Sequence, residues 1–143
     1  MLIANRGGNN NSIGIESCIN DGTDIYYTWQ KTAKLVAHLL YDNKLTFDDV
    51  KQHHYYSGKD CPQTMRRNGM WEHFMELVKC EYEAIPFLKE GYKFKLITDS
   101  IYLNNQGRIT LSDKEEVVKA CVEITKDKQK ELVEINLNIP SRG

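Results

Sequence analysis

The segment from His53 to Pro62 brings three kinds of reactive side chain together. It reads HHYYSGKDCP and contains imidazole, the amine of Lys59 and the thiol of Cys61. Neutral imidazole and thiolate are the ligands that zinc prefers, so a loop could bring His53 and Cys61 to one metal. The Lys59 cation would then lie beside the metal, where it could stabilise an oxyanion. Two ligands do not make a site, however, and a polar surface loop with a buried cysteine is the alternative interpretation.

Glu16 is the second candidate, and it lies in the apolar stretch Ile13-Gly14-Ile15-Glu16. A carboxylate within an apolar strand is costly unless it is paired or functional. Half of all strand positions face away from the core, so the position alone says little. Beside a zinc ion, Glu16 becomes a candidate general base.

Apolar spacing predicts the elements that carry these residues. Residues 1–12 are rich in Gly and Asn and predict a loop, whereas isoleucines at alternating positions predict a strand over 13–19. Apolar residues three and four apart predict one helix over 24–42 and another over 70–84. The reactive segment 53–62 lies between these two helices.

At Pro86 the apolar spacing changes from a helical to an alternating pattern. Beyond it, alternation predicts a strand over 92–97, and the sequence Asn-Asn-Gln-Gly predicts a hairpin turn at 104–107 with a return strand at 108–111. Ser112 followed by Glu115 fits a capping box, which predicts a third helix over 112–135. We therefore divide the chain into residues 1–85 and 86–143.

Composition limits the class of protein. The 143 residues are 41% hydrophobic and 27% charged, which is enough apolar side chain for a core and excludes global disorder. The net charge of −1 gives no field that would attract nucleic acid or an anionic membrane. No apolar run approaches the length of a membrane span, and no signal peptide is expected near Met1. We predict neither nucleic acid nor membrane as a partner.

Two motifs, in this order, resemble the zinc-dependent N-acetylmuramoyl-L-alanine amidases. Residues 11–16 read NSIGIE, and His53 with residues 57–62, SGKDCP, follows some forty residues later. The family includes phage endolysins, bacterial autolysins and peptidoglycan recognition proteins, and the resemblance covers roughly residues 5–84. It implies an α/β fold in which a mixed β-sheet is flanked by helices, with zinc at one end of the sheet.

The resemblance also implies roles for particular residues. His53 and Cys61 would be zinc ligands, Glu16 would take a proton from water, and Lys59 would stabilise the tetrahedral intermediate. The substrate would be peptidoglycan, cut between N-acetylmuramic acid and L-alanine of the muropeptide. Without a signal peptide, such an enzyme is expected in the cytoplasm before release and then acts at the bacterial cell wall.

One departure from the family pattern matters. The family carries another zinc-ligating His in a strand well upstream of the IGIE segment, and it has no counterpart here. His38 and His73 do not match it and are interpreted as surface residues of helices. The chain therefore resembles a family member that lacks its N-terminal part, and we expect little or no activity from it alone. A missing strand would also leave a sheet edge open beside Ile13–Ile19, which predicts a homo-oligomer.

Three functions remain open from the sequence. The first is a zinc amidase of the cell wall, which the presence of Glu16, Lys59 and Cys61 favours. The second is a non-catalytic module that binds peptidoglycan, which the missing ligand favours. The third is an interaction protein in which residues 86–143, as a hairpin and helix, drive assembly.

Overall fold

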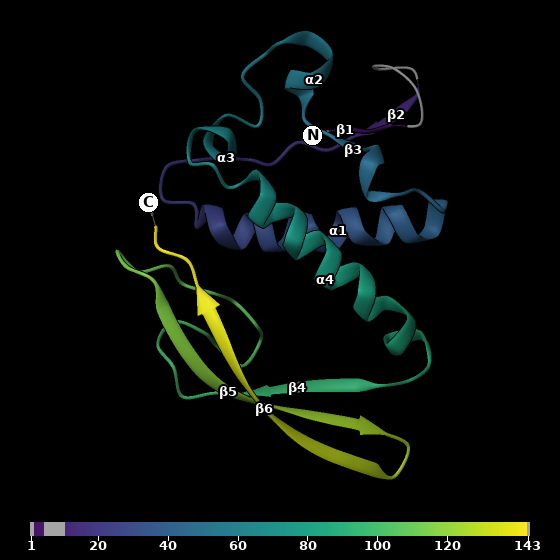
Figure 1. The fold of residues 1–143 in the computed structure, drawn as a ribbon, viewed down its shortest axis with the longest axis vertical. Helices are drawn as coiled ribbons and strands as arrows, with labels where there is room; N and C mark the ends of the chain where they lie inside the picture. The colour runs from purple at the N-terminus through teal and green to yellow at the C-terminus, as the bar shows by residue number, and fades with distance from the viewer. Residues whose placement is uncertain (1, 5–10, 143) are drawn as a thin grey trace. The chain divides into compact units, whose positions relative to one another are not determined.

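A computed structural model describes residues 2–4 and 11–142 as helices and two small sheets (Figure 1). The predicted α/β class is confirmed. The chain divides into two compact units, residues 1–85 and residues 86–143. Most of the Gly/Asn-rich segment predicted as a loop, residues 5–10, lies outside the described residues.

Two helices supply most of the first unit's core. Helix α1 spans Ile25–Asn43, which confirms the helix predicted over 24–42. The carboxylate of Asp24 caps its start by accepting a hydrogen bond from the Tyr27 backbone N–H at 3.0 Å. Helix α4 spans Trp71–Lys89 and continues past the end predicted at residue 84, with Pro86 inside it. No helix in the described part of the chain is long and apolar enough to cross a membrane.

Helices α1 and α4 cross while running in the same general direction (Figure 1). Tyr26 contacts His73 near the two helix starts, and Tyr41 packs edge-on against Tyr82 further along. The buried apolar side chains of this unit come mainly from the facing stripes of these helices: Tyr26, Trp29, Ala33, Val36, Ala37, Leu40, Phe74, Val78 and Ile85. This packing fixes α1, and residues 15–24, which precede α1, contact it through Ser17 and Thr32.

The first sheet is smaller than predicted and antiparallel rather than mixed. Strand β1 (Leu2–Ala4) lies between β2 (Ser12–Gly14) and β3 (Val50–Lys51). The start of the chain, predicted as a loop, thus contains a strand. The strand predicted over 13–19 ends at Gly14, because the chain then turns towards α1, where the Ser17 and Thr32 hydroxyls lie 3.2 Å apart.

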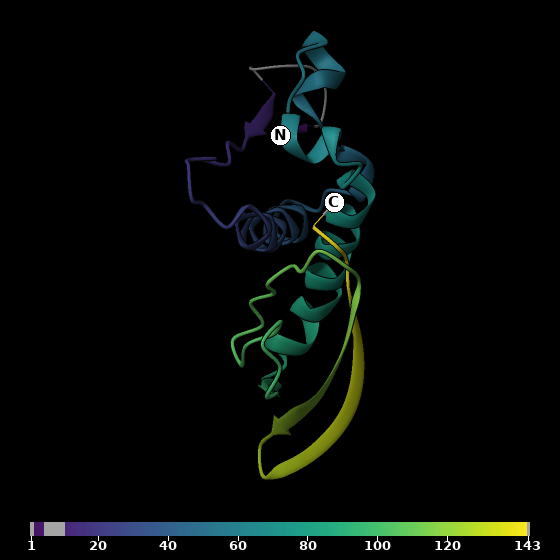
Figure 2. The same cartoon turned by 90° about the vertical axis from the view of Figure 1, so that its left-hand side faces the viewer.

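The second unit is an antiparallel meander. Strands β4 (Lys93–Ile97), β5 (Glu116–Lys126) and β6 (Gln129–Ile139) lie in that order. The last two form a long curved ribbon (Figure 2). A two-residue turn joins them, and its first residue, Asp127, takes a φ of 53°, a conformation that Asp tolerates.

The prediction of a helix over 112–135 is wrong, because strands β5 and β6 occupy most of this range. Val118 and Ala120 are buried, whereas Val117 and Lys119, which alternate with them, are exposed, Val117 by 68%. This is the two-residue period of a strand. The Ser112 hydroxyl donates to the Lys114 carbonyl at 2.6 Å instead of capping a helix. Valine, isoleucine and threonine are frequent here, and these β-branched residues favour strands.

The predicted hairpin turn at 104–107 is confirmed, since the Gly107 N–H donates to the Asn104 carbonyl at 2.9 Å. The return strand predicted at 108–111 is reduced to a single bridge between Leu103 and Ile109. Strand β4 pairs with β5 instead.

Candidate functional site

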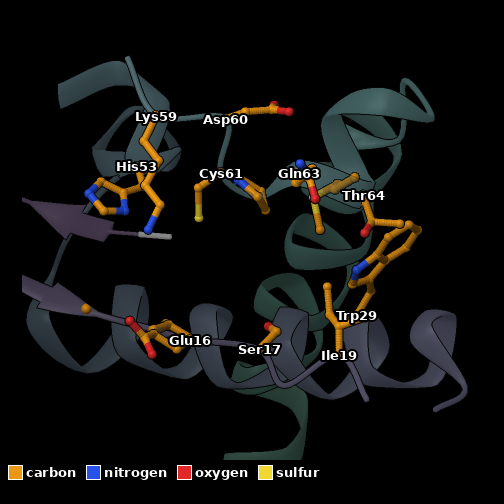
Figure 3. A pocket seen from close by; sticks show the side chains of 14 residues that line it. Glu16, Ser17, Ile19, Trp29, His53, Lys59, Asp60, Cys61, Gln63 and Thr64 are labelled. Carbon is orange, nitrogen blue, oxygen red and sulfur yellow. The ribbon is translucent and has the colours of Figure 1, made fainter. Parts of the chain in front are cut away.

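One pocket of the first unit is lined by all four residues singled out from the sequence, namely Glu16, His53, Lys59 and Cys61 (Figure 3). It has a volume of about 450 Å³. The other lining residues come from the end of β2 and the segment after it, from α1, from the loop after α2 and from the next short helix, residues 63–67: Gly14, Ile15, Ser17, Ile19, Trp29, Asp60, Pro62, Gln63, Thr64 and Met65.

The four residues occupy two facing walls. His53, Lys59 and Cys61 lie on one wall, and Glu16 lies on the other beside Ser17 (Figure 3). The Lys59 amine and the Cys61 sulfur point into the space between the walls. The pocket thus places a carboxylate opposite a cation, a thiol and an imidazole.

A tight reversal of the chain builds the first wall. The short helix α2 (His53–Ser57) ends at Gly58, whose φ of 69° belongs to the left-handed region that favours glycine. The chain then returns alongside α2, so the His54 N–H donates to the Cys61 carbonyl at 3.1 Å. This return brings His53 and Cys61 to the same wall although eight positions separate them.

His54 holds the loop and does not line the pocket. Its Nδ1 lies 3.2 Å from the Lys59 carbonyl oxygen. The Lys59 N–H donates to the Ser57 hydroxyl at 3.3 Å. These bonds fix the backbone that presents the Lys59 amine.

Asp60 connects this loop to the next helix, α3 (Gln63–Arg67), and sequence reasoning missed it. Its two carboxylate oxygens accept hydrogen bonds from Arg66 Nε at 3.1 Å and Arg67 Nε at 3.2 Å. Desolvation acts to raise the pKa of Asp60, but hydrogen bonds from Arg66 and Gln63 and the charge of Arg67 lower it overall. The sequence signal was an aspartate six and seven positions before two adjacent arginines.

Arg66 is also anchored on its other side, because its Nη1 donates to Gln52 Oε1 at 2.6 Å. Gln52 immediately precedes α2. Arg66 therefore bridges the residue before His53 and the residue before Cys61. This bridge ties the two ends of the chain reversal together.

The far end of the pocket is apolar and was also missed. Trp29 is 5% exposed and makes an edge contact with Tyr26, and Met65 is buried beside the pocket. Gln63 and Thr64 add polar atoms near the Trp29 ring (Figure 3). The spacing of Trp29 predicts only a core position, so the sequence carries no signal that its ring also lines a cavity.

The donor set matches zinc in kind but not in number. His53 and Cys61 offer the nitrogen and sulfur ligands that zinc prefers. The described residues contain no group of three or more His, Cys, Asp or Glu that could hold a metal ion. A metal held here would need further ligands beyond His53 and Cys61.

Comparison with known proteins finds two amidases of Bacillus subtilis (strain 168). The chain is 31% identical over 80 residues to N-acetylmuramoyl-L-alanine amidase CwlA, covering 54% of this chain and 29% of that protein. It is 33% identical over 70 residues to N-acetylmuramoyl-L-alanine amidase XlyA, covering 49% of this chain and 23% of that protein.

The chain therefore spans less than a third of the length of these curated relatives. No family model matches it, and no solved structure matches it. The two similarities support a distant relationship between about half of this chain and the N-acetylmuramoyl-L-alanine amidases.

Proposed function

We propose that the pocket belongs to a peptidoglycan amidase that hydrolyses the amide between N-acetylmuramic acid and L-alanine. The observation that carries the proposal is the convergence of Glu16, His53, Lys59 and Cys61 on one cavity. The similarity to CwlA and XlyA supports the same reaction. The protein would act at the bacterial cell wall, on muropeptide units.

His53 and Cys61 would hold a zinc ion, with the remaining ligands supplied by water or by groups outside the described residues. When bound, zinc supplies a Lewis acid and lowers the pKa of its water. The chain reversal at Gly58 and the bridge through Arg66 support this role, because they hold the two donors on one wall.

Glu16 and Lys59 would perform the proton and charge chemistry. Glu16 faces the donor wall across the cavity and would take the proton from the attacking water. The Lys59 cation points into the same space and would stabilise the negative oxygen of the tetrahedral intermediate. The leaving group is the amino group of L-alanine, which receives a proton as the amide breaks.

A second candidate function is binding of peptidoglycan without cleavage. The observation that favours it is the donor count, since the described residues contain no group of three or more His, Cys, Asp or Glu that could hold a metal ion. In that case the pocket would hold the muropeptide, and Glu16 would serve as a hydrogen-bond acceptor for its amide or hydroxyl groups.

The test is digestion of purified peptidoglycan by the full chain with and without added zinc. The sequence alone predicts little or no activity, because one zinc ligand is missing. With zinc added, we expect new amino groups on L-alanine, lost when a chelator is added, because the four site residues line one pocket. The Glu16→Gln variant should be at least about 100-fold slower, the lower range for a general base. The matched control is Glu72→Gln, which changes an exposed carboxylate of α4 outside the pocket and should keep the activity.

Co-sedimentation with insoluble peptidoglycan separates the two candidates. Binding without new L-alanine amino groups, with zinc present, would establish the non-catalytic function. Absence of both cleavage and binding would contradict both proposals.

A further inference from the structure

Strand β6 is a long sheet edge with unpaired backbone. It lies at the end of the order β4-β5-β6, and no strand among the described residues pairs with its other side. Its eleven residues pair with β5 in continuous register from Lys126↔Gln129 to Glu116↔Ile139. Such an edge presents a row of N–H and C=O groups that can accept another strand.

The turn determines which backbone groups point outward. Only two residues separate Lys126 from Gln129, so this pair must exchange both of its hydrogen bonds, and bonded pairs then alternate along the ribbon. The odd-numbered residues of β6 therefore bond to β5. The backbone groups that face away from β5 belong to the even-numbered residues Lys130, Leu132, Glu134, Asn136 and Asn138.

The edge carries few features that block pairing. Proline and β-bulges commonly protect edge strands. Between Gln129 and Ile139 there is no proline, and the continuous register leaves no bulge. Leu132, near the middle of this segment, is 59% exposed. The edge therefore has unpaired backbone groups and, at Leu132, a largely exposed apolar side chain.

We propose that β6 pairs in antiparallel fashion with β6 of a second copy of the chain, about a two-fold axis at Leu132. In this register Lys130 lies opposite the partner's Glu134, and by symmetry Glu134 lies opposite the partner's Lys130. Leu132 meets the partner's Leu132 on the same face. Opposite charges and apolar side chains directly across two strands stabilise their pairing.

Charge selects this register over its neighbours. A two-fold axis at Glu131 or at Glu134 would set two identical glutamates against each other, which is destabilising. An axis at Val133 or Ile135 would place no opposite charges across the interface. The self-complementary pattern Lys130-x-Leu132-x-Glu134 therefore identifies a second copy as the occupant of the edge.

The test is the mass of the full chain in solution, measured by sedimentation equilibrium over a range of concentrations. We expect a dimer of twice the 16.6 kDa chain mass. Lys130→Glu and Glu134→Lys should each weaken dimerisation by about tenfold, because each reverses two symmetry-related pairs. The double variant K130E/E134K should restore it. Lys128→Glu controls for the charge change, since it lies in the turn, where this register places no charged partner. Lys130 also pairs with Glu123 of its own chain at 2.7 Å, so Glu134→Lys tests the interface without removing that pair.

Cross-linking provides a second measurement. In this register the two copies of Leu132 form a hydrogen-bonded pair, whose Cα separation of about 5.5 Å suits a disulfide. The Leu132→Cys variant should therefore form a covalent dimer through position 132 on mild oxidation, whereas Val117→Cys should not. We expect a dimer dissociation constant on the order of micromolar. A chain that stays monomeric at about 200 μM would therefore overturn the proposal. A dimer that persists unchanged in both single charge reversals would overturn it as well.

Discussion

The Tyr26 hydroxyl lies 2.5 Å from Nε2 of His73, which joins the first turns of α1 and α4. Tyr26 is 2% exposed, and its ring also contacts Trp29, whose side chain lines the pocket. Burial raises the pKa of Tyr26 to about 12, so the phenol remains a hydrogen-bond donor. The expectation that His73 is a surface residue is therefore wrong, and the pair supports one end of the site.

Removing this hydrogen bond should destabilise the fold. Tyr26→Phe keeps the ring but leaves the half-buried His73 nitrogen without its partner, which costs about 1–2 kcal/mol. Urea unfolding followed by circular dichroism measures the loss. Tyr55→Phe is the control, because Tyr55 is exposed and should change the free energy of unfolding little. Equal effects of the two variants would contradict the role of the pair.

His73 should also make stability depend on pH. Burial lowers the pKa of His73 below its ordinary value of 6.5, although the charge of Glu76 acts in the opposite direction. The unfolded chain therefore binds more protons below about pH 6.5, so this contribution is complete above pH 6.5 and is lost as the pH falls through the folded pKa. His73→Gln keeps an acceptor for Tyr26 but does not titrate.

The measurement is the free energy of unfolding between pH 7.5 and 5 for wild type and His73→Gln. The variant should lose less stability on acidification. The other three histidines are common to both proteins, so the difference isolates His73. Parallel pH profiles would contradict the prediction.

The sequence predicts α1 and part of α4 because their apolar residues fit only a helical period. Trp29, Ala33, Val36 and Leu40 recur at steps of three and four, and polar residues separate them. Residues 117–124 read VVKACVEI, which places apolar side chains at both helical and strand spacing. Local periodicity cannot choose between these structures, and pairing with β6, beyond the turn at 127–128, decides it.

Zinc binding at the pocket should depend on His53 and Cys61 and not on His38 or Cys80. His53→Ala and Cys61→Ser should each weaken the affinity by at least about tenfold, since even indirect support of a metal is worth that much. His38→Ala and Cys80→Ser are the matched controls, because neither residue lines the pocket. Competition with a chromophoric chelator measures the affinity, and unchanged binding in both pocket variants would refute the assignment.

Gly58 should be required for the geometry of the donor wall. Its φ of 69° is strained for a residue with a Cβ, although no atom lies within 4 Å of where that Cβ would be. Gly58→Ala should therefore cost about 1 kcal/mol through backbone strain alone. Gly58→Asn should cost less, because Asn tolerates the left-handed region. Urea unfolding distinguishes the two, and an Asn variant less stable than the Ala variant would contradict a backbone origin.

Of the candidate site, only the residues that belong to the two sequence motifs could be predicted. Glu16, His53, Lys59 and Cys61 stand in two short motifs, and the structure brings them to one pocket. The bridges from Arg66 to Gln52 and Asp60 depend on how two short helices pack around a reversed loop. Spacing offers only a weak signal for the pairing of Asp60 with the arginines and none for the contact of Arg66 with Gln52. It offers none for the Trp29 ring at the pocket's far end either.

Two adjacent valines provide a direct test of the second unit. Val118 is 4% exposed and packs with Leu103, Ala120 and Ile139, whereas Val117 on the opposite face is 68% exposed. Val118→Ala should cost about 2 kcal/mol from lost burial and a residual cavity. Val117→Ala should change the free energy of unfolding by less than about 0.5 kcal/mol. A helix over 112–135 would reverse this order, because Val117 would then share a buried face with Ala120, Cys121 and Ile124. Urea unfolding of the two variants therefore distinguishes the strand from the helix at a single pair of positions.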